Sequence, residues 1–327
     1  MKTKVFTQEK WLKVCAANKE LLKDFVLELR SNKYSPRTIE QYQCDLRMLL
    51  CYILEELENR YILDLTRKDF RQIKMWYLDE REVSSARCNR VMSAIHSMLD
   101  FAEDDDDYEY EFNVSKKVKG ITKEATKEIV FLEDCQIKRL RDYLIEHEKY
   151  RLLALLDLLY DSGARRREIW QVKKTGLLEH NYTNIVEGKG GKKFPLIYFS
   201  RTQESLELYL DQRGDDGFES LWVVGDGEFR KEAKISAIYC WVLEMREILS
   251  MLYEKPMLVT PHSFRHSALQ NMKDGTHYIC RELNNGKGFG LEQLKIYAHH
   301  NDTGTTEGYL KNDDNNVLEQ MFGIKIA

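Results

Sequence analysis

The sequence predicts a mainly α (α+β) fold, in which an N-terminal helical bundle is followed by a mainly helical domain with a small antiparallel sheet. Apolar residues recur at spacings of three and four through most of the chain, and residues 182–200 have the pattern of strand, turn and strand. A dense acidic run at residues 103–111 separates the two parts. The chain has 327 residues, 43% of them apolar, which is enough to build two cores.

Residues 18–102 should form the bundle, with four helices. The first has apolar residues at helical spacing from Leu21 to Leu29. The later helix starts are marked by capping residues and a proline: Ser35, Pro36, Thr66 and either Ser84 or Ser85. Residues 1–17 form an N-terminal extension that is too short to be a domain.

Basic residues lie near the starts of these helices, where side chains and backbone amides can reach phosphates. They are Arg37, Arg67, Lys68, Arg87 and Arg90. From these residues alone, a phosphate-binding face and an ordinary solvated surface are equally open.

The charge of the chain is uneven. Its net charge is −4, yet residues 1–102 carry 18 Lys and Arg against 15 Asp and Glu, while residues 103–111 hold seven acids and no base. Such a run repels itself, so we expect residues 103–126 to form an exposed acidic linker. A near-neutral domain can still present a basic face to a nucleic acid.

Residues 127–310 should form the second domain. An apolar helix over residues 151–161 ends at Gly163, and further helices are expected at residues 135–146, 204–211 and 236–253. A turn that carries Lys189, Lys192 and Lys193 joins the two strands. Residues 311–327 form a C-terminal tail with apolar residues at helical spacing.

Three stretches carry candidate catalytic residues. His300 lies nine residues before Tyr309, across a short polar turn. His262 and Arg265 are three apart, which places them on one face of a helix. Arg165 follows the turn at Gly163. A phenol, with a pKa of about 10, is a poor nucleophile at neutral pH, so a catalytic tyrosine needs cations around the group that it attacks.

These stretches resemble, in order and register, the tyrosine recombinase (phage integrase) family. The shared pattern is Gly-x-Arg-x-x-Glu at residues 163–168, His-x-x-Arg at residues 262–265, and a histidine nine residues before a tyrosine. The Ser-Pro-x-Thr, Tyr-x-x-Asp-Leu and Asn-Arg positions of the bundle are similar to the family's core-binding domain. The resemblance covers residues 18–309. It implies a tyrosine recombinase fold with a SAM-like core-binding domain (18–102), a catalytic domain (127–310) and a tail for subunit contact (311–327).

The resemblance also assigns roles. Six residues are assigned to catalysis and one to their support: Arg165, Lys189, His262, Arg265, His300 and Tyr309, with Glu168 in support. The two arginines would clamp the scissile phosphate, and the lysine would protonate the leaving 5′ oxygen. The first histidine would assist proton transfer from the tyrosine, the nucleophile, and the second would donate a hydrogen bond to the phosphate. The glutamate would orient the first arginine.

The implied activity is site-specific recombination through a 3′-phosphotyrosyl intermediate, with no cofactor and no metal. The implied partners are double-stranded DNA, a homotetramer on that DNA and, in some settings, an accessory DNA-bending or directionality factor. No apolar run reaches about 18 residues and no signal-peptide core is present, so we expect a cytoplasmic protein without a membrane partner. Roles in a mobile element and in chromosome-dimer resolution both stay open.

Other readings are weaker. A type IB topoisomerase shares the chemistry, and a non-catalytic DNA-binding regulator would not need the nucleophile. His262 and His266 have helical metal-ligand spacing, but Ser263 stands where a zinc protease has glutamate. Residues 187–193 lack the phosphate-loop pattern, and the seven cysteines contain no Cys-x-x-Cys pair.

The chain departs from the family pattern in two places. His299 stands where a glycine usually precedes the third motif histidine. His300 lies 35 positions after Arg265, which exceeds the usual spacing, and residues 276–290 resemble an inserted loop.

Overall fold

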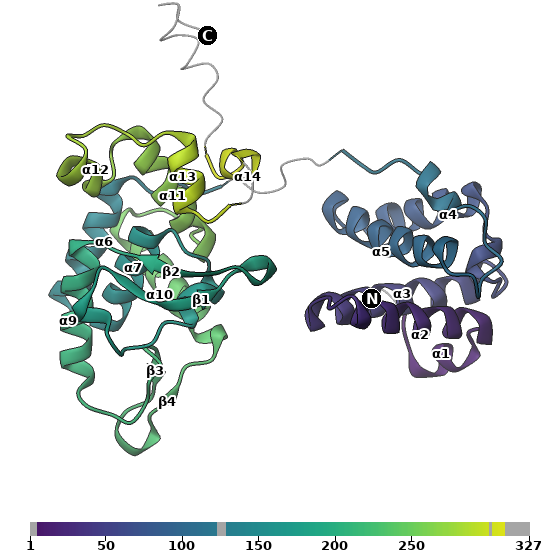
Figure 1. Cartoon of the computed structure of the whole chain (residues 1–327), viewed down its shortest axis with the longest axis horizontal. Coiled ribbons are helices and arrows are strands. Elements are labelled where there is room, and N and C mark those ends of the chain that lie inside the picture. Colours follow the sequence, from purple (N-terminus) through teal and green to yellow (C-terminus); the bar gives the residue numbers. More distant parts are fainter. Residues whose placement is uncertain (1–4, 123–128, 301–302, 311–327) are drawn as a thin grey trace, which may run out of the picture. The chain divides into compact units, whose positions relative to one another are not determined.

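The computed structural model describes residues 5–122, 129–300 and 303–310 and divides into two compact units, Met1–Thr126 and Lys127–Ala327 (Figure 1). The predicted mainly helical fold with a small antiparallel sheet is confirmed. The tail at residues 311–327, predicted to contact a neighbouring subunit, lies outside the described residues. No helix within the described ranges combines the length and apolar character needed to span a membrane.

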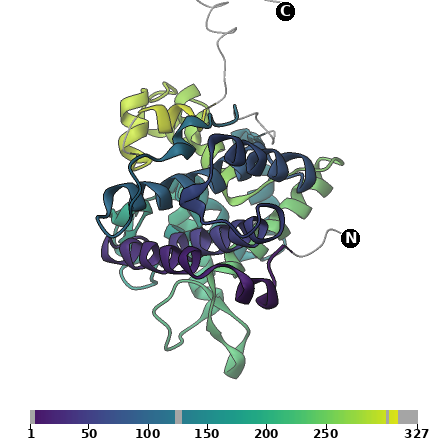
Figure 2. The ribbon, with the colours of Figure 1, turned by 90° about the vertical axis from the view of Figure 1, so that its right-hand side faces the viewer.

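The first unit is a helical bundle, seen from a second side in Figure 2. Its elements are α1 (Gln8–Lys13), α2 (Ala16–Ser31), α3 (Pro36–Glu56), η1 (Ile62–Asp64), α4 (Arg67–Met75), η2 (Trp76–Glu80), α5 (Ser85–Asp104) and η3 (Val114–Lys117). The predicted helix starts are confirmed: the Ser35 and Ser84 side chains cap α3 and α5, and Thr66 forms a capping box with Asp69 at α4. The apolar faces of α2, α3 and α5 share one core.

The segment after α5 is packed, which corrects the expected exposed linker. Glu103 and Asp104 belong to α5, and the chain then returns along that helix. The Tyr108 hydroxyl donates to Asp24 (2.8 Å), and the fully buried Asn113 side chain donates to the His96 carbonyl (3.0 Å). The Glu103 carboxylate accepts from the Asn113 backbone amide (3.2 Å), and this bond, with the tyrosine and amide side chains, anchors the chain to the bundle.

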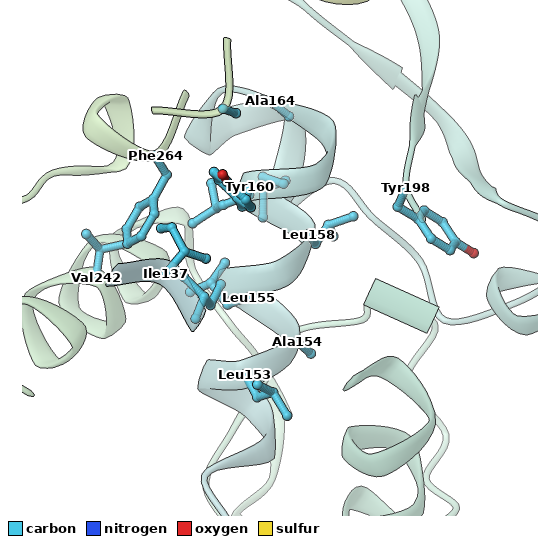
Figure 3. Close-up of a cluster of buried hydrophobic side chains, with 14 of the residues drawn as sticks. Ile137, Leu153, Ala154, Leu155, Leu158, Tyr160, Ala164, Tyr198, Val242 and Phe264 are labelled. Atoms are coloured by element: carbon cyan, nitrogen blue, oxygen red, sulfur yellow. The ribbon is translucent and has the colours of Figure 1, made fainter. Parts of the chain in front are cut away.

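The second unit is built around α7 (Tyr150–Ser162), whose side chains from Leu152 onward are all buried. A helix that is apolar all round belongs in a core. Figure 3 shows its leucines among Ile137, Val242 and Phe264. The surrounding elements are α6 (Asp134–Glu146), α8 (Arg166–Trp170), η4 (Leu177–Glu179), β1 (Tyr182–Glu187), η5 (Lys189–Gly191), β2 (Lys193–Ile197), α9 (Ser200–Arg213), β3 (Val223–Val224), η6 (Gly227–Phe229), β4 (Lys231–Glu232), α10 (Ile235–Leu252), α11 (Pro261–Asp274), α12 (Tyr278–Leu283), α13 (Leu291–Tyr297) and α14 (Thr303–Glu307).

The strands pair as two antiparallel hairpins, β1 with β2 and β3 with β4. The first is the predicted strand–turn–strand at residues 182–200, and it projects from the body of the unit (Figure 1). The second, short pair was not predicted, because strands of two residues leave no alternation of apolar and polar residues to read.

The sequence predicted an inserted loop at residues 276–290. The structure instead has α12 and a close-packed turn in this segment. The Tyr278 hydroxyl donates to the buried Asp161 carboxylate (2.8 and 2.9 Å), which ends α7. A Cβ at Gly288 would lie 1.8 Å from the Lys273 carbonyl oxygen, so only glycine fits there. The insertion therefore supports the end of the helix that leads into Arg165.

Candidate active site

Arg265 is the centre of the cluster formed by the predicted catalytic residues. It lies on α11 and is only 1% exposed. Its guanidinium donates to the carbonyl oxygens of Gly163 and Ala298 (2.8 Å for the latter) and contacts His300 Nε2 at 2.6 Å. One side chain thus joins the turn after α7, the turn after α13 and the third motif histidine.

These bonds fix the tautomer of His300. A guanidinium has donors only, so Nε2 must accept from Arg265 and the ring proton lies on Nδ1. Nδ1 donates to Thr306 Oγ1 at 2.8 Å, and both side chains are buried. His300 is therefore neutral here and accepts from the arginine, whereas the predicted donation to a phosphate would use Nε2 as a donor.

Tyr309 lies against the same cluster, just after α14. Its ring stacks on His300, with centroids 5.1 Å apart, and the Arg265 guanidinium lies 4.9 Å from its centroid. The backbone of Tyr309 is held as well, because His266 Nδ1 donates to its carbonyl oxygen at 2.8 Å. The second histidine of the His-x-x-Arg-His run thus positions the tyrosine segment directly.

Arg165 and Glu168 form a rigid pair at the start of α8. The Glu168 carboxylate is buried and accepts from the Arg165 backbone (2.7 Å) and from its guanidinium (3.1 Å). The Arg165 side chain is 22% exposed, so part of its fork stays open to solvent. This geometry fits the predicted role of Glu168 in orienting the arginine.

The site is strongly cationic, and burial together with its positive charges lowers the pKa values of Arg265 and His262. Burial, with the nearby Arg165 charge, lowers the pKa of Arg265 to about 10, so it stays charged at neutral pH. Burial of part of the ring, with the charges of Arg265, Arg165 and Arg166, lowers the pKa of His262 from its ordinary value of 6.5. His262 is exposed at the edge of the site and should be neutral at pH 7.

Lys189 is the predicted catalytic residue that the structure does not bring into the cluster. It lies at the exposed tip of the β1–β2 hairpin, and its amine makes no hydrogen bond or ion pair to other described residues. His299, at the position expected to be glycine, has a left-handed backbone (φ 53°), the conformation that glycine adopts most readily. Its ring stacks on Phe194 of β2.

The predicted DNA-binding residues of the first unit fall into two groups. Arg37, Arg67 and Lys68 are exposed. Arg87 instead donates through both terminal nitrogens to the fully buried Asp45, and Arg90 lies 3.7 Å from the same carboxylate. Arg87 is therefore engaged by Asp45 and is less available to a phosphate than the three exposed residues.

Further basic residues surround Arg67, and the sequence patterns did not single them out. A groove of about 370 Å³ between α4 and the returning segment has five basic residues in its lining: Arg67, Arg71, Lys74, Lys117 and Lys119. Lys74 Nζ donates to the Lys119 carbonyl at 2.9 Å and so links α4 to the returning segment. Their proximity depends on how residues 105–122 pack, which no local pattern shows.

We expect Arg87→Ala to lower the stability of the protein much more than Arg67→Ala does. Arg87→Ala leaves the buried Asp45 carboxylate without its main partner, which should lower the free energy of unfolding by about 3 kcal/mol. Arg67→Ala removes an exposed charge and should change stability by less than about 0.5 kcal/mol. Urea denaturation of the full chain measures both. Unchanged stability of Arg87→Ala with a loss of DNA affinity would support Arg87 as a phosphate ligand.

His266 and Thr306 were missed as site residues by the sequence reasoning. Thr306 lies three residues before Tyr309, and this spacing was the available signal; nothing local showed that it would bond His300. In the described ranges, no three His, Cys, Asp or Glu side chains are arranged to hold a metal ion.

Known proteins resemble this chain in sequence over most of its length. Residues 22–105 match the phage integrase N-terminal SAM-like domain. The SPbeta prophage-derived recombinase-like protein YomM of Bacillus subtilis is 26% identical over 317 residues, covering 92% of this chain and 89% of YomM. Tyrosine recombinase XerC of Leptospira interrogans is 22% identical over 302 residues, covering 92% of this chain and 91% of XerC.

Two solved structures share the fold. A lambda integrase tetramer bound to a Holliday junction aligns with a TM-score of 0.65 at 15% identity, over 90% of this chain and 77% of that one. The Tn1549 transposon integrase in complex with transposon right end DNA gives 0.62 at 12% identity, over 93% and 99%. With these matches along most of its length, the chain is similar to proteins of the tyrosine recombinase (phage integrase) family.

Proposed function

We propose that this protein is a site-specific recombinase that cleaves and rejoins duplex DNA through a 3′-phosphotyrosyl intermediate. The observation that carries the proposal is the convergence of Arg265, His300 and Tyr309, which come from separate parts of the second unit. A buried guanidinium beside a tyrosine ring places a permanent cation where a phosphate under attack would gain negative charge.

The proposed reaction exchanges one phosphate ester for another. The Tyr309 Oη–P bond forms as the P–O5′ bond breaks, the phenol proton passes to His262, and Lys189 protonates the leaving 5′ oxygen. The phosphotyrosyl ester conserves the energy of the broken phosphodiester bond, so a 5′ hydroxyl from another strand can reseal the DNA without ATP. Arg165 and Arg265 contribute by stabilising the charge on the phosphoryl oxygens.

The cluster must rearrange before it can act in this way. Arg265 is buried, and its terminal nitrogens donate to Gly163, Ala298 and His300. The Tyr309 ring lies over the same guanidinium. We expect DNA binding to move Tyr309 off Arg265 and to break the Arg265–His300 bond. His300 must then gain a proton on Nε2, either as the imidazolium or as the other tautomer with Thr306 Oγ1 donating to Nδ1, before it can donate to the phosphate.

The relatives support the proposed partners. One solved relative is a tetramer on a Holliday junction and another is bound to transposon end DNA, so we propose a homotetramer on double-stranded DNA as the working form. The test is strand exchange between two labelled duplexes drawn from the DNA that flanks the gene. Relaxation of supercoiled DNA without exchange would indicate a topoisomerase-like activity instead.

The pH dependence of cleavage tests the role of His262. A base acts in its deprotonated form, and the pKa of His262 lies below 6.5, so the cleavage rate should stay level from pH 8 to pH 7 and fall only below 6.5. His262→Asn should be slower and lose that acidic limb, while His147→Asn, a change at an exposed histidine on α6's C-cap, should keep it. A His262→Asn profile that matches the wild-type profile would exclude His262 as the base.

A further inference from the structure

The Phe194 ring of β2 stacks on His299, and this contact connects the lysine hairpin to the active-site turn. The two ring centroids are 3.7 Å apart and the planes differ by 19°. Phe194 is 8% exposed and belongs to the main core of the unit. His299 immediately precedes His300, so one end of the stack is fixed at the catalytic cluster.

The Phe194 ring also lies close to Gly188. A Cβ built at Gly188 would lie 2.7 and 2.8 Å from two ring carbons of Phe194, and 3.2 Å from the Glu168 carboxylate. Only a glycine therefore allows this approach. Gly188 directly precedes Lys189, and its amide donates to the Lys192 carbonyl at 2.8 Å. The ring thus contacts both the base of the lysine turn and His299.

Three separate motifs therefore lie close together: Glu168 lies beside Gly188, at the start of the lysine turn, and Phe194 of the same hairpin stacks on His299 in the turn that carries His300. Glycine would adopt the left-handed backbone at position 299 more readily, but it would leave the outer face of Phe194 without a stacking partner.

We propose that His299 is a positioning residue for Lys189: its stack on Phe194 holds the β1–β2 hairpin in register with the Arg265–His300 cluster. The inference rests on the proposed recombinase function. Lys189 can donate a proton to the 5′ oxygen only if the exposed hairpin tip returns to the same place in each cleavage event. The stack supplies that constraint at the base of the hairpin.

The test compares two leaving groups. The protein is incubated with a nicked duplex from the gene's flanking DNA, made either with the ordinary 5′ oxygen or with a bridging 5′ sulfur. A thiol has a pKa of about 8.5, so a sulfur leaving group needs no proton donor. The variants are His299→Asn, which tolerates the left-handed backbone but has no ring, and His299→Tyr, which keeps a ring for stacking. The references are Lys189→Ala and the double variant Lys189→Ala/His299→Asn.

On ordinary DNA we expect His299→Asn to cleave about three- to tenfold more slowly than wild type, the range of one lost aromatic contact. His299→Tyr should recover part of the rate. On the sulfur substrate all single variants should cleave within about twofold of wild type. In the Lys189→Ala background, His299→Asn should have no further effect, because residues that act through one another are not additive.

Two outcomes would overturn the inference: a wild-type rate for His299→Asn on ordinary DNA, or a loss of equal size on both substrates, which would show that His299 does not act through the proton donor. A wild-type protein that forms no adduct with either substrate would be a different failure. It would remove the proposed recombinase function, and this inference with it.

Discussion

Tyr309→Phe should abolish covalent attachment to DNA while leaving DNA binding and folding intact. The phenylalanine ring can keep the stack on His300 and the contact with Arg265, so only the hydroxyl is lost. Because that hydroxyl is the proposed nucleophile, we expect cleavage to fall by more than about 10³-fold. Adduct formation on a nicked duplex and a gel-shift titration measure the two properties.

The matched control is Tyr297→Phe. The Tyr297 hydroxyl is buried and has no hydrogen-bond partner among the described residues, so its removal tests a nearby tyrosine outside the proposed chemistry. We expect its cleavage rate to stay within about threefold of wild type. Equal loss in both variants would mean that packing of the site, and not the Tyr309 nucleophile, limits the reaction.

Arg265→Lys should lower the cleavage rate by about 10²- to 10³-fold, although the positive charge is kept. Loss of one preorganised donor to a developing charge has this magnitude. A lysine ammonium is compact and lacks the planar fork that reaches Gly163, Ala298 and His300 together. The cleavage rate on a nicked duplex is the measurement.

Two further variants separate chemistry from folding in the Arg265 experiment. Arg165→Lys changes the partly exposed arginine of the pair with Glu168 and should also cleave slowly, with less effect on thermal stability because fewer buried groups lose partners. Arg167→Lys, at an exposed arginine two residues further on, should cleave normally. A folded Arg265→Lys protein that cleaves at the wild-type rate would contradict the clamp.

Local chemistry made much of the fold predictable. The starts of α3, α4 and α5 follow from capping side chains at Ser35, Thr66 and Ser84, each of which accepts from the backbone amide three residues on. The end of α7 follows from Gly163, which takes the left-handed conformation (φ 55°). Such signals lie within one turn of the chain, so a sequence shows them directly.

Contacts between distant segments were not predictable in this way. The charges of the acidic run are visible in the sequence and predict an exposed linker. The contacts that pack this segment, such as the hydrogen bond from Tyr108 to Asp24, depend on α2 lying nearby. The ion pair between Arg87 and Asp45 could not be predicted for the same reason, because the two residues are 42 positions apart. The bonds of His300 with Arg265 and Thr306 required the assembled site.

Trapping of the covalent intermediate tests the central claim most directly. The full chain is incubated with a nicked suicide duplex from the gene's flanking DNA, in buffer with a metal chelator, and the denatured adduct is digested and sequenced by mass spectrometry. We expect a single DNA-linked peptide, with the DNA attached through its 3′ phosphate to Tyr309. DNA attached to a different residue, or cleavage without a protein-linked 3′ end, would contradict the account.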